Sequence, residues 1–435
     1  MLNSSFMDYK NESAALKTIR YPENQLSKPL IIEGPGDIDQ IELDDSINNC
    51  ISYPSEESWY KLCNILDQGL SILLTEEQFA KIADNLAKYY KNQPIRSILT
   101  LRVFQICIKK FQQSLHPLLV DFFLNDLISL FKRETPIPQM IELFQTLYYL
   151  IPLSTDEQLR KLSFDLKNFY FEICLSESFP FSNFIGCLHS IIEHCNNVFD
   201  TFLDLSNIIE NLTVRKDWGL SFDCIGIFIT LIQKDPKICT YLVEETHIFE
   251  LLDSLFCRKN DCLNWKIVKI YYLLFKELNL IPTNDLFMKI FNFLPTENFR
   301  LETSVINFLI LAVTFSDEYL HFLSQENLFL RIKNFGNLKF SQKVAIMRFA
   351  RTVLEKSPSL FLNQITDDIV NIAVDAIESS NAKMAGNGIF VLFLLAKEGK
   401  FDLNEIDFST AEQIEDVNVH RLIDLVIKTR ENVNE

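Results

Sequence analysis

Apolar residues recur every three or four positions along most of this chain, which is the spacing of one face of an α-helix. The stretch AGNGIFVLFLLAKEGK at residues 385–400 shows the pattern well, with Lys397 in the last turn and Gly399 where a C-terminal cap is expected. Its unbroken apolar run predicts a helix that is covered on both sides. A buried strand is excluded, because corresponding stretches such as KVAIMRFARTVLEK keep the helical spacing and do not alternate. No GxGxxG or GxxxxGK[ST] motif surrounds its glycines, which excludes a phosphate-binding loop.

These helical segments recur with a period of about 41 residues. Two junctions at which proline starts a helix, Asp235-Pro236 and Ser357-Pro358, lie 122 residues apart, close to three such periods. Each regular unit has a short helical turn, a second helix, a polar loop and a longer apolar third helix. The regular units begin at Cys195, Asp235, Ser316 and Ser357, a fifth fills the gap between the second and third of these, and weaker units cover 75–113, 114–153 and 154–195.

Residues 1–56 differ in composition from the rest of the chain. They are polar and acidic, and the run DIDQIELDD places five acids in nine positions. This composition is typical of a disordered segment. We therefore expect an acidic, disordered segment over 1–56 and a helical repeat domain over 57–435, which ends in a capping helix near Val417–Thr429.

Composition and charge narrow the class of function. The chain is 48% hydrophobic yet has only 10 glycines, which favours helices joined by short connections. The net charge of −17 argues against nucleic-acid binding, which needs a basic excess. No apolar run reaches the roughly 18 residues of a membrane span. The ten cysteines lack a CxxC motif and follow no secretory leader, so we expect a soluble protein with reduced thiols in the cytoplasm, the nucleus or both.

Candidate catalytic and metal-binding residues are few. The densest cluster is formed by Cys187, His189, Glu193, His194 and Cys195. On a helix, Cys187 and His194 lie about 10 Å apart along the axis, too far apart for one zinc ion to bind both. No nucleophile motif combines serine, histidine and an acid. We therefore expect no metal, no cofactor and no enzymatic activity.

A short helix, a second helix and a long buried third helix, repeated every forty or so residues, resemble the armadillo/HEAT repeat superfamily. The resemblance covers residues 75–400, and IFVLFLLA at Ile389–Ala396 is similar to the armadillo third-helix pattern. It implies an all-α, right-handed α-solenoid of about eight armadillo-like helical repeats, whose third helices line a groove that binds extended peptides or proteins. The chain departs from the importin alpha type, because Trp59, Trp218 and Trp265 are not followed four residues later by asparagine.

Cations recur on the expected third helices of the C-terminal units, although the chain as a whole is acidic. We interpret them as a basic groove for an acidic or phosphorylated peptide, as in family members of the β-catenin type. The alternative is a solvated face with local ion pairs, for instance Arg351 with Glu355. Two asparagines precede apolar runs, and their amides could bind the backbone of an extended ligand. The candidate protein-binding residues are Lys266, Lys269, Asn307, Lys343, Arg348, Arg351, Lys383 and Asn387.

We therefore expect a non-catalytic scaffold or adaptor that binds a partner protein or an extended acidic peptide along its third helices. Two alternatives stay open: an importin-alpha-like nuclear transport adaptor, and a regulatory subunit of a kinase or phosphatase complex. Binding to basic peptides would favour the first alternative, and co-purification with an active catalytic chain the second. The identity of the partner, the biological process and the oligomeric state are open at this point.

Overall fold

The computed structural model divides the chain into two compact units, residues 1–74 and 75–435. It describes residues 40–53 and 55–68, short stretches between 78 and 131, and residues 135–433 apart from 174–178, 214–216, 257–259, 333–337 and 403–405. All regular structure in these described parts is helical, and none of it is strand. None of the described helices has the length and apolar character that crossing a membrane requires.

The first unit contains helices α2 (Gln40–Ser52) and α3 (Glu56–Gln68), which pack on each other. Part of the segment expected to be disordered is therefore helical. The reason is the spacing of Leu43, Ile47 and Cys50, which are buried on one face of α2 while most of the acids stay outside. The Cys50 thiol donates a hydrogen bond to the backbone oxygen of Ser58 at 3.1 Å. Residues 1–39 lie outside the described residues, and their disorder stays a prediction.

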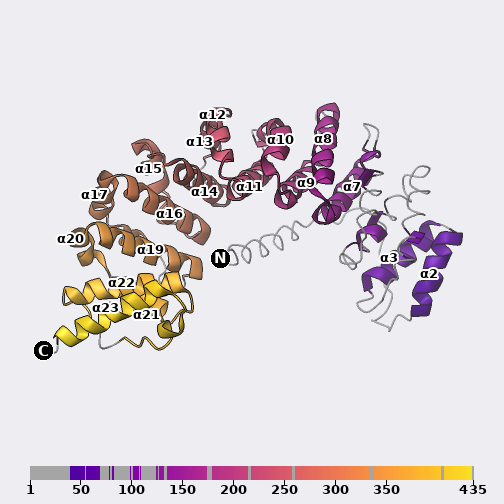
Figure 1. The fold of residues 1–435 in the computed structure, drawn as a ribbon. Helices are drawn as coiled ribbons and strands as arrows, with labels where there is room; N and C mark the ends of the chain where they lie inside the picture. The colour runs from indigo at the N-terminus through magenta and orange to yellow at the C-terminus, as the bar shows by residue number, and fades with distance from the viewer. Residues whose placement is uncertain are drawn as a thin grey trace. The chain divides into compact units, whose positions relative to one another are not determined.

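In the second unit, long helices pack side by side in the order of the sequence (Figure 1). We call them the helix row; it corresponds to the third helices expected from the repeats. From α9 onward, successive row helices begin 37 to 43 residues apart, in agreement with the period in the sequence. The row consists of α7 (Ile137–Leu150), α9 (Phe181–His194), α11 (Trp218–Lys234), α14 (Asp261–Leu278), α16 (Phe299–Phe315), α19 (Phe340–Lys356) and α22 (Ala382–Lys397).

Between α7 and α22, the other described helices connect the row helices and cover them. They are α8 (Asp156–Ile173), α10 (Val198–Thr213), α12 (Ile238–Glu244), α13 (Ile248–Leu255), α15 (Asn284–Phe291), α17 (Asp317–Gln325), α18 (Leu328–Arg331), α20 (Pro358–Phe361) and α21 (Asp367–Ile377), with 3-10 turns at Ile151–Leu153, Leu362–Gln364 and Ala411–Gln413. Helix α23 (Val417–Val433) packs on α22, where the capping helix is expected. The architecture confirms an all-α, armadillo-like solenoid. The number of units stays a prediction.

Polar caps explain where most of the row helices begin. Asp217, Asn260, Asn298 and Asn381 each precede a row helix and accept a hydrogen bond from the backbone N–H groups of its first turn. Apolar side chains then bury most of the circumference of the row helices from α9 to α19, because each of these contacts a row neighbour on either side and a covering helix behind.

Gly388 marks the closest approach between α22 and its covering helix α21. A Cβ atom at position 388 would lie 2.6 Å from the backbone oxygen of Ala373 and 2.8 Å from the Cβ of Ala376. The absence of a side chain at Gly388 therefore lets the backbones of α21 and α22 lie close together. At Gly386 the nearest atoms would be 3.8 Å away, which is ordinary van der Waals contact.

Candidate partner-binding surface

All eight candidate residues lie on four consecutive row helices, α14, α16, α19 and α22. These helices pack on one another in that order, so the structure brings the candidates onto one part of the row. Seven of them, all except Lys266, are exposed or half-exposed, and they recur at helical spacing between the buried positions. Lys343 contacts the covering helix α21, and we call the other six the row face: Lys269, Asn307, Arg348, Arg351, Lys383 and Asn387.

Lys266 is a packing residue that joins α14 to α11. Its side chain is buried, and its ammonium nitrogen donates a hydrogen bond to the backbone oxygen of Phe222 at 2.9 Å. The same nitrogen lies 3.3 Å from the centroid of the Phe222 ring. The absence of a side chain at Gly226 leaves room for it, because a Cβ there would stand 2.9 Å from the ammonium. The charge of Lys266 is therefore used inside the fold.

Lys343 and Arg351 are paired with neighbouring side chains. Lys343 contacts the carboxylate of Asp375 on α21 at 2.7 Å. Arg351 binds Glu355 at 2.8 Å, which confirms the pair anticipated from the sequence. It also donates a hydrogen bond to the side-chain oxygen of Asn387 at 3.3 Å. Arg351 thus links α19 to α22, and a partner would have to compete with Glu355 for it.

Arg348 and Lys383 differ from these paired cations. Both are exposed, and neither forms an ion pair with another residue that the structure describes. Arg348 also lies close enough to Lys276 of α14 for the two charges to interact. The pKa of Lys276 is raised by its hydrogen bond to Glu277, and the positive charge of Arg348 acts in the opposite direction. Positive charge from α14, α19 and α22 is therefore present on one stretch of the row.

The other row-face residues are polar or partly covered. Asn307 is half-exposed on α16, and its side chain makes no hydrogen bond to the described part of the chain. Lys269 lies with its ammonium 5.9 Å from the centroid of the Trp265 ring. An amide and an ammonium in such positions can donate hydrogen bonds to a carboxylate or to a peptide carbonyl.

The earlier helices α9 and α11 carry a different set of groups. His189 of α9 is hydrogen-bonded to the Thr230 hydroxyl of α11 at 2.9 Å, and burial, followed by the charge of Lys266, lowers its pKa to about 4. Burial raises the pKa of Asp223 to about 6, against the opposing effect of Lys266. From the sequence, His189 was considered only as a candidate metal ligand and Asp223 was not singled out, because their partners Thr230 and Lys266 lie about 40 residues away from them in the sequence.

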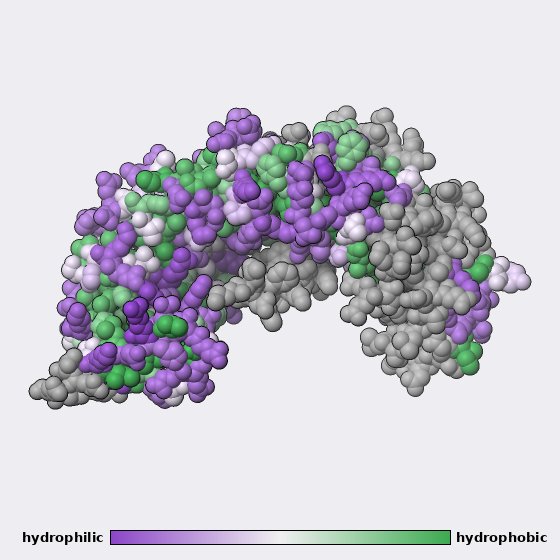
Figure 2. All heavy atoms as spheres, in the orientation of Figure 1, coloured by the Kyte–Doolittle hydropathy of each residue, from purple (hydrophilic) through white to green (hydrophobic). Residues whose placement is uncertain are grey.

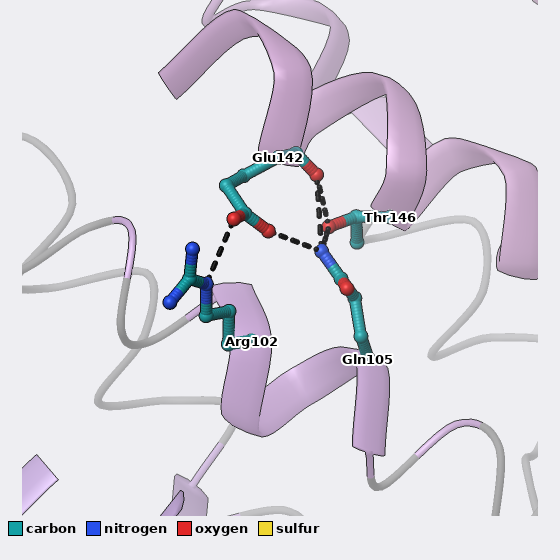
Figure 3. A network of polar contacts seen from close by, with 4 residues as sticks. All are labelled: Arg102, Gln105, Glu142 and Thr146. Carbon is teal, nitrogen blue, oxygen red and sulfur yellow. Dashed lines mark hydrogen bonds and ion pairs between the residues drawn. The ribbon is translucent and has the colours of Figure 1, made fainter. Parts of the chain in front are cut away.

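Buried carboxylates also join neighbouring helices at the beginning of the row (Figure 3). Glu142 of α7 accepts hydrogen bonds from Arg102 at 2.8 Å and from Gln105 at 3.0 Å, and Gln105 also donates to Thr146 at 3.1 Å. A similar contact joins two later row helices, since the Gln342 side chain of α19 donates to the buried carboxylate of Glu302 on α16. These acids serve as packing partners between helices.

The described surface combines polar side chains with scattered apolar ones. Figure 2 shows mostly hydrophilic residues in this view, with smaller hydrophobic areas between them. Three exposed aromatic residues share one position, because Trp218, Phe299 and Phe340 are the first residues of α11, α16 and α19. None of the three was predicted from the sequence as a binding residue. Within the described residues, no three His, Cys, Asp or Glu side chains come together as metal ligands.

Comparisons with known proteins bear on the fold alone. No protein-family model and no curated protein matches the chain. Among solved structures, it is similar to an engineered protein with a TM-score of 0.57 and 11% identity, over 92% of this chain and all of that one. It also matches the karyopherin Kap121p, bound to the SUMO protease Ulp1p, with a TM-score of 0.36 and 11% identity over 86% of this chain and 34% of that one.

A further match is to the TOG-domain arrays of microtubule polymerases, with a TM-score of 0.28 and 8% identity over 86% of this chain and 96% of that one. Similarities at this level of identity carry no function across. The order, period and packing of its helices give the chain the architecture of an all-α helical solenoid of the armadillo/HEAT type.

Proposed function

We propose that this chain is a non-catalytic scaffold or adaptor that binds an acidic segment of a partner protein on its row face. The observation that carries the proposal is the pair Arg348 and Lys383, which are exposed on adjacent helices and form no ion pair within the described chain. In a protein of net charge −17, cations left without a carboxylate favour an acidic partner.

The chemistry of the face suits carboxylates. The guanidinium of Arg348 can bind a carboxylate through two parallel hydrogen bonds, and Lys383 adds a second positive charge on the next helix. Asn307 can donate to a peptide carbonyl. Helical repeats present such residues along an extended surface, because each unit buries its apolar face on its neighbours. Exposed ion pairs contribute only about 0.2–1 kcal/mol each, so we expect modest affinity that falls as salt rises.

Fluorescence polarisation with a labelled decaglutamate peptide tests the proposal. Wild type should bind it, more weakly at 300 mM than at 50 mM NaCl, and should bind labelled decalysine less well. The variant Arg348→Glu with Lys383→Glu should lose at least tenfold in affinity. A matched control is Lys237→Glu with Lys428→Glu, which changes the net charge equally at two exposed lysines away from the row face. The control should stay within about threefold of wild type.

Two results would contradict the proposal. An equal loss in both double variants would mean that the probe responds to net charge and not to the row face. Stronger binding of decalysine than of decaglutamate would assign the protein to recognition of basic segments.

A further inference from the structure

Two exposed aromatic rings lie at one end of the row face. Phe299 is 38% exposed and Phe340 is 56% exposed, each as the first residue of its helix. The hydrogen bond from Gln342 to Glu302 joins the first turns of these helices, so α16 and α19 begin level with one another. The two rings therefore lie at the same end of neighbouring helices.

Helix α19 carries an apolar and a cationic group on one face. Phe340, Val344 and Arg348 follow each other at intervals of four residues, and all three are exposed or half-exposed. At 1.5 Å per residue, Arg348 lies about 6 Å along the axis from Val344 and about 12 Å from Phe340. A ligand that reaches Arg348 along this face therefore also lies close to apolar surface.

Positive charge continues at the aromatic end. The guanidinium carbon of Arg300 lies 5.6 Å from the centroid of the Phe299 ring and 5.5 Å from that of Trp265. Lys339, the exposed residue before Phe340, adds a further cation. Such a surface, with aromatic rings among cations, is complementary to a segment that combines apolar side chains with carboxylates.

We propose that the partner segment carries a bulky apolar side chain two to four residues from a carboxylate. The apolar side chain packs on Phe340 and Val344 while the carboxylate binds Arg348. The spacing follows from the geometry, because an extended chain advances about 3.3 Å per residue and must span about 6–12 Å. This inference rests on the proposed function, since it concerns the same face.

The size of the apolar area favours a short segment over a second copy of the chain. Each aromatic ring can bury about 150–250 Å² at most, so Phe299 and Phe340 together offer a few hundred square ångströms. Stable protein interfaces bury at least about 1,200 Å² in total. One or two apolar side chains of a peptide match this area.

Three labelled peptides test the inference: decaglutamate, the same peptide with leucine at its fifth position, and decaglutamate joined to leucine through eight glycine and serine residues. On wild type, the internal leucine should tighten binding about tenfold, and the distant leucine should not. Phe340→Ser with Val344→Ser should abolish this gain and leave decaglutamate binding unchanged. The control Trp218→Ser removes an exposed aromatic at the same helix position outside this face and should keep the gain.

The outcomes separate this inference from the proposed function. If decaglutamate binds in a salt-dependent way and the internal leucine adds nothing, the inference is overturned and the proposed function stands. Failure of every peptide to bind overturns both. A gain that persists in the Phe340 and Val344 variant, checked by circular dichroism to be folded, also overturns the inference. The inference is also overturned if light scattering shows a dimer of wild type that the substitution Phe340→Ser dissociates, because a second copy of the chain would then occupy the face.

Discussion

Gly388→Ala and Gly386→Ala should change stability in opposite directions, although they lie two residues apart on α22. At position 388, the new methyl group would stand 2.6 Å from the Ala373 oxygen and 2.8 Å from the Ala376 Cβ. Neither of these atoms can rotate away, because one belongs to the backbone of α21 and the other is attached directly to it. Contacts between carbon atoms are best at about 3.5–4.0 Å, so α21 and α22 would have to separate by roughly 1 Å.

The magnitude follows from two opposing contributions. Replacing a helical glycine with alanine stabilises a helix by about 1 kcal/mol, and overpacking a tight interface costs about 1–3 kcal/mol. Because the clash at Gly388 involves backbone, we expect a net loss of about 1–2 kcal/mol in the free energy of unfolding. At Gly386 the methyl group would lie 3.8 Å from Leu422 and Val419, so the gain of up to about 1 kcal/mol should be retained.

Urea unfolding followed by circular dichroism measures both variants. Because a solenoid is stabilised by contacts between neighbouring units, hydrogen exchange should place the Gly388→Ala effect in α21 and α22 and leave α9 and α11 unchanged. The reasoning is refuted if Gly388→Ala is as stable as wild type, or if Gly386→Ala is the more damaging of the two.

The remaining predictions concern pH and thiol reactivity. Burial raises the pKa of Asp223 from 3.8 to about 6, so its ionisation costs stability as pH rises through that range. The variant Asp223→Asn should therefore resist urea better than wild type at pH 7.5 but not at pH 3.5. A variant less stable than wild type at pH 7.5 would contradict this. Burial lowers the pKa of His189 from 6.5 to about 4, so the free energy of unfolding falls as pH drops through that range. The variant His189→Gln should lose less stability over the same range. An equal loss in wild type and variant would contradict this prediction. Iodoacetamide should label exposed Cys262 in the native protein before Cys187 or Cys224, because burial raises the pKa of both buried thiols. Peptide mass spectrometry measures the order of labelling, and Cys187 labelled first would contradict this prediction.

The helical order of the chain was predictable because it depends on local signals. The three-and-four spacing of apolar residues and the glycine cap at Gly399 act within one turn or two, and the helices expected from such signals lie close to the observed bounds of α22 and α23. The boundary at residue 56 was less accurate. The acids of α2 suggested disorder, whereas burial of Leu43 and Ile47 against α3 outweighs them, and that contact lies beyond a local reading of the sequence.

The helices that carry the candidate residues were predictable from the sequence. Whether each cation is buried, paired or exposed was not. Lys266 and Lys269 lie one turn apart on α14 and look equivalent in the sequence. The structure buries Lys266 because Gly226 and Phe222 of α11 leave space and an acceptor for its ammonium. Likewise, the pairing of Lys343 with Asp375 joins residues 32 positions apart. Only the packing of neighbouring units decides which cations stay available.

Photo-crosslinking tests the central claim most directly. A decaglutamate probe carrying a benzophenone group is irradiated on the full chain, and the attached peptides are identified by mass spectrometry. The account predicts crosslinks within Phe340–Lys356 and Ala382–Lys397, and their loss in the Arg348→Glu, Lys383→Glu variant. Crosslinks confined to the covering helices, such as α8 and α10, or to residues 1–74 would contradict it.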